Sequence, residues 1–188
     1  SWWSAMEDAS RDVKRYQQER FLLSQLLVMS LKGVPAFYLP ALLGSENDIK
    51  RFSMTGERRD LNREKFHLEK LLIQLDNKDS IANKNIKVLS KAMKIRSKFK
   101  SFHPSAKMKC LTKGRRDIVA IKRGFGNSSI FAIHNITDNK LNFSIDESLD
   151  FPLGDVITYC DYLSGKKYEN LNFVLEPFEV LWIGKIND

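Results

Sequence analysis

The stretch SLKGVPAFYLPALLGSENDIKRFSMTGERRDLNREKF, residues 30 to 66, decides how the rest of the chain is interpreted. It begins at the end of an apolar helix, continues as an apolar run led by Gly33 and Pro35, and ends in a long polar loop. A continuous apolar run is typical of a strand buried on both faces, and Pro is tolerated at the first positions of a strand. We therefore predict a buried strand over residues 34 to 39 and a loop over residues 44 to 63, with room for a short helical insertion.

Helical periodicity flanks this stretch on both sides. Residues 10 to 31 are expected to form a helix that stops at Gly33. The second half of this helix is apolar nearly all round, which requires cover on more than one side. Residues 64 to 75 and 80 to 100 are predicted to form two further helices.

Beyond Pro104 the helical periodicity gives way to short β-rich runs separated by turn residues. Such runs favour an antiparallel sandwich. We therefore predict two domains, residues 1–103 and residues 104–188. The predicted strands are residues 108–112, 118–122, 129–135, 141–145, 156–161, 171–175 and 178–183.

Three motifs resemble glycoside hydrolase family 13, the α-amylase superfamily. The run GVPAFY, residues 33–38, resembles the Gly-Ile-Pro turn and apolar strand that form the eighth barrel strand of that family. LLGSEND, residues 42–48, and TGERRDLNREK, residues 55–65, are similar to the sucrose phosphorylase and glucosylglycerate phosphorylase subfamily. The final run LEPFEVLWI, residues 175–183, resembles the last strands of the β domain that ends these enzymes.

This resemblance implies the fold class. The chain is expected to be an α+β fragment: the last helix-strand-helix part of a (β/α)8 barrel, with two closing helices, followed by an antiparallel all-β sandwich. A complete barrel of this kind needs about 250 residues, more than the 188 of this chain. The barrel strand is expected to place the polar loop on the face where such enzymes have their active sites.

Retaining glycosyl transfer needs two carboxylates about 5 Å apart. The resemblance places both on upstream barrel strands, so we expect no catalytic residue in this chain and no activity from it alone. In the intact enzyme the resemblance implies an α-glucoside substrate, inorganic phosphate as the acceptor, α-glucose 1-phosphate as the product, and the remaining barrel segment as the partner. No cofactor and no metal are expected.

The resemblance assigns a substrate-binding role to Arg63, in the run LNREK. A guanidinium there could pair with a carboxylate and donate to sugar hydroxyls through its fixed fork. Asn62, Arg59 and Asp60 belong to the same loop and are expected to shape the acceptor site. From the residues alone, Arg63 could equally cap or salt-bridge a helix starting at Glu64.

Departures from the subfamily pattern keep the reaction open. Residues 39–41 and Glu46 differ from the expected loop, and Leu61 stands where Ile is more usual. A hydrolase or transglucosylase of the α-amylase superfamily is therefore an alternative. Another alternative is a self-standing module in which the β region binds carbohydrate or another protein without catalysis.

The formal charge of +8 raises the possibility of a nucleic-acid partner. The lysines between residues 84 and 113 fall at spacings typical of a solvated helix face, and no nucleic-acid-binding motif accompanies them. We therefore expect no nucleic acid.

The apolar stretch at residues 21 to 43 is interrupted by Lys32 and Pro35, so we expect no membrane span and a cytoplasmic location. Cys110 and Cys160 lack metal-ligand spacing and are expected to be reduced packing residues.

Overall fold

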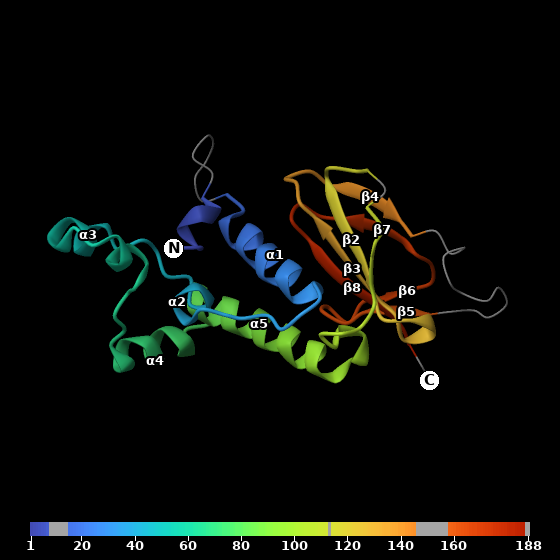
Figure 1. Cartoon of the computed structure of the whole chain (residues 1–188), viewed down its shortest axis with the longest axis horizontal. Helices are drawn as coiled ribbons and strands as arrows, with labels where there is room; N and C mark the ends of the chain where they lie inside the picture. Colours follow the sequence, from blue (N-terminus) through green and yellow to red (C-terminus); the bar gives the residue numbers. More distant parts are fainter. Residues whose placement is uncertain (8–14, 113, 146–157, 187–188) are drawn as a thin grey trace. The chain divides into compact units, whose positions relative to one another are not determined.

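The computed structural model of the chain describes residues 1–7, 15–112, 114–145 and 158–186. It divides into two compact units (Figure 1). The first unit comprises Ser1–Leu22 and Ala36–Ser90, and the second comprises Leu23–Pro35 and Lys91–Asp188. The predicted domain boundary near residue 104 lies inside the second unit and stays a prediction about the intact protein.

Helices make up the first unit, and two of them continue into the second. The helices and 3-10 turns up to residue 98 are η1 (Ser4–Met6), α1 (Gln17–Ser30), α2 (Leu39–Leu42), α3 (Ile49–Thr55), η2 (Arg58–Asn62), α4 (Leu68–Asp76) and α5 (Ile81–Lys98). Residues 10–14 of the predicted first helix lie outside the described residues. The helix predicted to start at residue 64 begins instead at Leu68.

Local capping explains where the shorter helices begin and end. The Asp48 carboxylate accepts a hydrogen bond from the Arg51 amide at 2.8 Å and so starts α3. Gly56 ends α3 with φ 69°, a left-handed angle that Gly adopts without strain. The Ser80 hydroxyl accepts from the Asn83 amide at 3.0 Å at the start of α5.

The first unit buries some of its apolar side chains and leaves others exposed. Trp3 is buried and contacts Phe21 edge-on, with ring centroids 5.4 Å apart, so its side chain is part of the core of this unit. In α4, by contrast, no residue is buried, and Leu68, Leu72 and Ile73 are all exposed. Leu68 and Leu72 are four positions apart and so share one helix face. This face therefore has no cover within the described part of the first unit.

The predicted strand over residues 34 to 39 is not a strand in the structure. Residues 34–38 have no regular secondary structure, although Tyr38 has extended backbone angles, φ −98° and ψ 121°. Val34 and Tyr38 are exposed, so this run is not buried on both faces. A strand needs a neighbouring strand to share its hydrogen bonds, and no described strand lies beside this run. The prediction is therefore wrong for this chain by itself.

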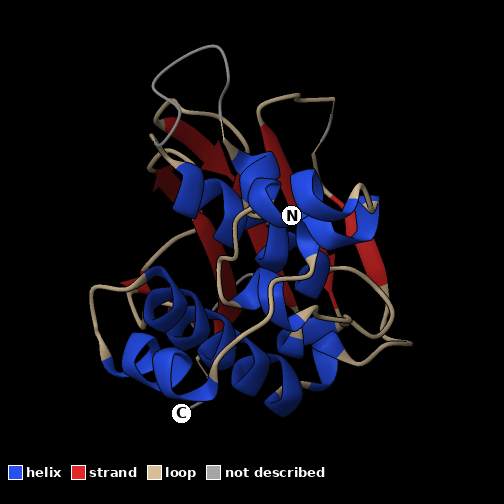
Figure 2. Cartoon of the chain, turned by 90° about the vertical axis from the view of Figure 1, so that its left-hand side faces the viewer, coloured by secondary structure: helices blue, strands red, loops and turns tan. Residues whose placement is uncertain are grey.

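All described strands belong to the second unit (Figure 2). Six form an antiparallel sheet in the order β1-β2-β3-β8-β5-β6, and β4 pairs with β7 in a separate two-stranded sheet. The strands are β1 (Met108–Cys110), β2 (Ile118–Arg123), β3 (Ile130–Asn135), β4 (Leu141–Ser144), β5 (Tyr159–Asp161), β6 (Lys167–Tyr168), β7 (Asn172–Leu175) and β8 (Val180–Lys185).

Seven of these eight strands coincide with predicted runs. The sequence pattern missed β6 because two residues are too few to show an alternation. Residues 156–157 of the run predicted before β5 lie outside the described residues. The two remaining short helices are η3 (Lys100–Phe102) and η4 (Gly126–Ser128). The chain is therefore an α+β fragment with an antiparallel sheet.

The core of the second unit collects the apolar side chains of both sheets. It contains Ile118 and Ala120 of β2, Phe131 and Ile133 of β3, and Leu181 and Ile183 of β8, among others. Residues two positions apart on a strand point to the same face of the sheet, so each of these pairs enters the same core. The remaining residues of β2 and β3 are buried as well, apart from the half-buried Val119. Cys110 is a free thiol that is exposed, contrary to the expected packing role, and Cys160 is free and half-buried.

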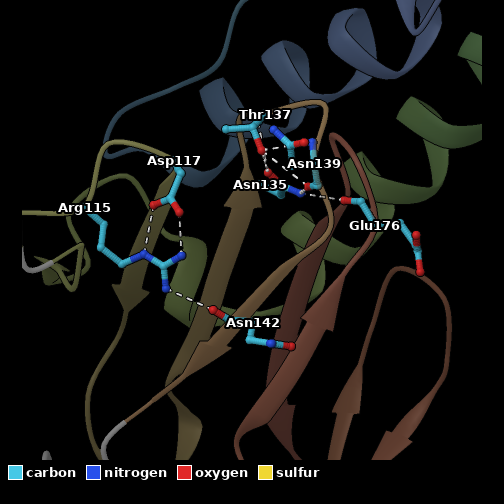
Figure 3. Close-up of polar contacts among 7 residues, drawn as sticks. All are labelled: Arg115, Asp117, Asn135, Thr137, Asn139, Asn142 and Glu176. Carbon is cyan, nitrogen blue, oxygen red and sulfur yellow. Dashed lines mark hydrogen bonds and ion pairs between the residues drawn. The ribbon is translucent and has the colours of Figure 1, made fainter.

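Polar side chains fix the turns at one end of these sheets (Figure 3). Asn135 is buried, and its amide donates to the carbonyls of Asn139 at 2.7 Å and Glu176 at 2.8 Å. Its carbonyl oxygen accepts from both the amide and the hydroxyl of Thr137. The whole amide group of Asn135 is therefore committed to holding this turn.

Arg115 makes a second connection in the same region. Its guanidinium pairs with both carboxylate oxygens of Asp117, at 2.9 and 2.7 Å, and donates to the Asn142 carbonyl at 3.0 Å (Figure 3). This pair links the start of β2 to β4. Hydrogen bonding to Arg115 lowers the pKa of the Asp117 carboxyl below its ordinary value.

Candidate functional site

The predicted polar loop contains two short helical segments, α3 and η2, that hold each other in place. Arg51 of α3 forms an ion pair with Asp60 of η2 at 3.0 Å. The Asp48 amide donates to the Leu61 carbonyl at 2.8 Å. The hydrogen bond from Arg51 is also the main reason that the pKa of Asp60 lies below its ordinary value. The helical insertion that the sequence allowed is thus present, and Asp60 serves to order it.

Arg63 follows η2 directly and is exposed. Its backbone angles, φ −120° and ψ 62°, mark the end of that segment. Helix α4 begins five residues further on, after His67, so Arg63 does not cap it. Within the described residues no hydrogen bond or ion pair occupies the Arg63 side chain. Its donors therefore face solvent in this chain.

The other two candidate side chains lie in the same segment. Arg59 and Asn62 are exposed members of η2. The Asn62 carbonyl accepts a hydrogen bond from the Tyr38 hydroxyl at 3.3 Å, which ties the segment to the residue that ends the extended run. Arg59, Asn62 and Arg63 thus present two guanidinium groups and one amide to solvent from five consecutive residues.

A cavity of about 460 Å³ lies beside this loop in the first unit. Glu64 contributes to its wall, whereas none of the four predicted binding residues does. A volume of this size is in the range of small-molecule sites. Sequence reasoning missed the cavity because its wall combines residues from three separate segments. Its lining residues are Leu43, Gly44, Ser45, Glu46, Asn47, Asp48, Glu64, Phe66, Gln74, Ser80, Ile81 and Ala82.

Asn47 and Asp48 have structural partners at the rim of this cavity. The side-chain oxygen of Asn47 accepts a hydrogen bond from the amino group of Ser1, and the backbone amide of Asn47 donates to the Ser4 hydroxyl at 3.0 Å. Asp48 caps α3, as described above. Both residues therefore order the loop.

The described residues contain no group of three or more His, Cys, Asp and Glu side chains arranged to hold a metal ion. The loop itself offers hydrogen-bond donors and positive charge from Arg59, Asn62 and Arg63. Exposed guanidinium groups bind carboxylates, phosphates and vicinal hydroxyls through paired N–H donors. The loop thus has the donors needed to bind an anionic or hydroxyl-rich ligand.

No helix within the described ranges combines the length and apolar character that crossing a membrane requires. No family model matches the chain.

Solved structures of α-amylase family enzymes share the fold. A Bacillus licheniformis trehalose-6-phosphate hydrolase superposes with a TM-score of 0.68 at 13% identity, covering 94% of this chain and 40% of that one. An Anoxybacillus α-amylase superposes with a TM-score of 0.66 at 15% identity, covering 92% of this chain and 33% of that one. At such identities the likeness shows the fold alone, which is that of part of an α-amylase family protein.

Curated relatives make the assignment more specific. A glucosylglycerate phosphorylase of Allomeiothermus silvanus is 29% identical over 164 residues, which are 87% of this chain and 26% of that protein. The glucosylglycerate phosphorylase of Escherichia coli is 24% identical over 87% of this chain and 28% of its own length. The chain spans about a quarter to a third of the curated relatives it matches. The predicted resemblance to the C-terminal portion of a family 13 phosphorylase is therefore confirmed.

Proposed function

We propose that this chain is the part of a retaining α-glucoside phosphorylase that carries the substrate-binding loop and the β domain. The intact enzyme would transfer a glucosyl group from a glucosylglycerate-like donor to phosphate and release α-glucose 1-phosphate. The observation that carries the proposal is sequence similarity to glucosylglycerate phosphorylases over 87% of the chain. The two catalytic carboxylates would belong to the remaining barrel segment.

Within this proposal Arg63 contacts the sugar or the acceptor. Its guanidinium is exposed and has no partner among the described residues, so it is available to a ligand. Arg59 and Asn62 add donors beside it, which suits phosphate or a glycerate carboxylate. Asp60 has a supporting role, because its carboxylate is already paired with Arg51.

The remaining barrel segment is the proposed partner of the first unit. Tyr38 and Leu39 are more than half exposed, as are Leu68, Leu72 and Ile73 of α4. Exposed apolar surface of this extent usually marks an interaction site. The backbone of residues 36–38 belongs to no helix or strand, so its amides could donate hydrogen bonds to the carbonyls of a neighbouring strand. These features are what a self-standing module would avoid.

The role of Arg63 can be tested in the intact protein that contains this chain. R63K keeps the positive charge but removes the fork, so kcat/KM for phosphorolysis of glucosylglycerate should fall roughly 10- to 100-fold, the range for a lost charge-assisted hydrogen bond. R116K changes an exposed arginine of the second unit in the same way and should leave kcat/KM unchanged. Equal activities of wild type, R63K and R116K would remove Arg63 from the substrate site.

A further inference from the structure

Arg123, the last residue of β2, is fully buried and points its guanidinium at backbone carbonyls. Its Nη1 donates to the Ser30 carbonyl at 2.9 Å and also to the Leu31 carbonyl. Its Nη2 donates to the His103 carbonyl at 2.8 Å. Ser30 is the last residue of α1, so Arg123 binds the carboxyl end of that helix.

Arg96, from the carboxyl-terminal part of α5, binds the same end of α1 from another element. It donates to the Met29 carbonyl, and its Nη2 donates to the Gly33 carbonyl at 2.7 Å. The last carbonyls of a helix have no partner within the helix and carry a partial negative charge. Between them the two arginines bind four of the five carbonyls from residue 29 to residue 33.

These two charges have no carboxylate partner within the described residues. Burial lowers the pKa of both guanidinium groups, and for Arg123 the nearby Arg96 lowers the pKa further. Both also lie over the Phe102 ring, 5.6 and 5.9 Å from its centroid. Arg123 is fully buried and Arg96 is half-buried, and desolvated like charges are destabilising unless their donors are well placed. Here the donors of both guanidinium groups are directed at backbone carbonyls.

The Ser30 side chain adds a third attachment at the same point. Its hydroxyl accepts a hydrogen bond from the Trp182 ring nitrogen at 3.2 Å and lies 3.2 Å from His134 Nε2. Trp182 and His134 belong to β8 and β3, neighbouring strands of the six-stranded sheet. The end of α1 is therefore attached to three strands and to α5.

We propose that Arg96 and Arg123 are positioning residues that fix the course of residues 29–33. The chain continues from there through residues 34–38 to the loop that carries Arg63. By binding the carbonyls of residues 29–33, the two arginines hold the segment from which this run continues. The consequence for sugar binding rests on the proposed function, whereas the consequence for the backbone of residues 29–33 does not.

Amide hydrogen exchange on the chain tests the backbone claim. In R96K and in R123K the carbonyls lose the fork that holds them. Exchange at Leu31 and Gly33, whose amides donate to Val28 and Pro104 at 3.3 Å, should accelerate about tenfold or more. The amides of β3 and β8 should keep their wild-type exchange rates, and R116K should change none. Unchanged exchange at Leu31 and Gly33 would overturn the proposal, as would equal acceleration throughout the sheet.

A double variant of the intact protein tests the functional consequence. If Arg96 acts through the position of Arg63, R96K should lower kcat/KM mainly by raising KM for the glucosyl donor. Adding R96K to R63K should then have much less effect than R96K has in the wild type. If the fold losses in kcat/KM of R96K and R63K simply multiply in the double variant, the proposed coupling between Arg96 and Arg63 is wrong. If R63K alone has no effect while exchange at Gly33 accelerates in R96K, the proposed function fails and the backbone role of the arginines remains.

Discussion

At the scale of single residues, Asn135 shows how one buried amide can hold a turn. Asn135→Asp would lose both donors to the Asn139 and Glu176 carbonyls and would place a charge against them. We expect the free energy of unfolding to fall by about 2–4 kcal/mol. Asn142→Asp makes the same change at an exposed side chain and should alter stability by less than about 0.5 kcal/mol. Urea unfolding of both variants checks the comparison, and similar losses would contradict it.

His134 gives a prediction for pH. Burial lowers the pKa of His134 to about 4, whereas an exposed histidine has a pKa of about 6.5. Its Nδ1 lies 3.0 Å from the Val119 carbonyl, which can only accept, so Nδ1 carries the single proton of the neutral ring. Between pH 4 and 6.5 the unfolded chain binds this proton and the folded chain does not. Folding stability should therefore fall as the pH drops through this window, by about 3 kcal/mol in total.

His134→Asn isolates this contribution, because the Asn amide can still donate to Val119 but does not titrate. The difference in free energy of unfolding between wild type and H134N should shrink as the pH falls from 7 to 4. Denaturant unfolding at several pH values measures it. A difference that stays constant across this range would show that His134 does not titrate differently in the two states.

The candidate site could be only partly predicted at this scale. The LNREK run predicts a substrate-binding role for Arg63, and this stays a prediction. The ion pair of Asp60 with Arg51 could not be predicted, because it depends on how α3 and η2 pack. The binding of Arg96 and Arg123 to the end of α1 could not be predicted either, because both arginines are far from residue 30 in the sequence.

At the scale of elements, two glycines with similar backbone angles offer a matched comparison. Gly44 has φ 72°, and an added Cβ would lie 2.4 Å from Ile81 Cγ2. Gly56 has φ 69°, with nothing within 4 Å of an added Cβ. Gly56→Ala should therefore destabilise by about 1–2 kcal/mol through backbone strain alone. Gly44→Ala should carry the same cost of backbone strain and lose about 1–3 kcal/mol more of folding stability through the clash with Ile81 of α5.

Chemical denaturation of G44A and G56A, followed by helical circular dichroism, measures both losses. Equal losses would mean that the loop moves away from α5 without resistance. Larger damage from G56A would contradict the packing between Gly44 and Ile81.

The elements themselves were predictable to different degrees. β7 alternates between exposed and buried residues, whereas β2 and β3 are buried almost throughout. All three were found from the sequence because apolar, β-branched and aromatic residues gather between turn residues. The run 34–38 has the composition of a strand, yet it forms none here because no strand lies beside it in the described structure. Sequence composition shows whether a segment is suited to form a strand. Whether it forms one depends on another strand lying beside it to share hydrogen bonds.

At the scale of the whole molecule, the two units differ in how well they cover their own apolar residues. The second unit has a continuous core shared by its two sheets, although it also exposes Val34, Phe125 and Val174. The first exposes apolar residues on α4, on α3 and at Tyr38 and Leu39. This difference supports the proposal that the first unit packs against further polypeptide in the intact protein.

The most direct measurement is the yield of α-glucose 1-phosphate from glucosylglycerate by the intact protein, with and without inorganic phosphate. We predict that this product forms only when phosphate is present, in amounts equal to the phosphate consumed. Release of free glucose at the same rate with or without phosphate would contradict the account and identify a hydrolase instead.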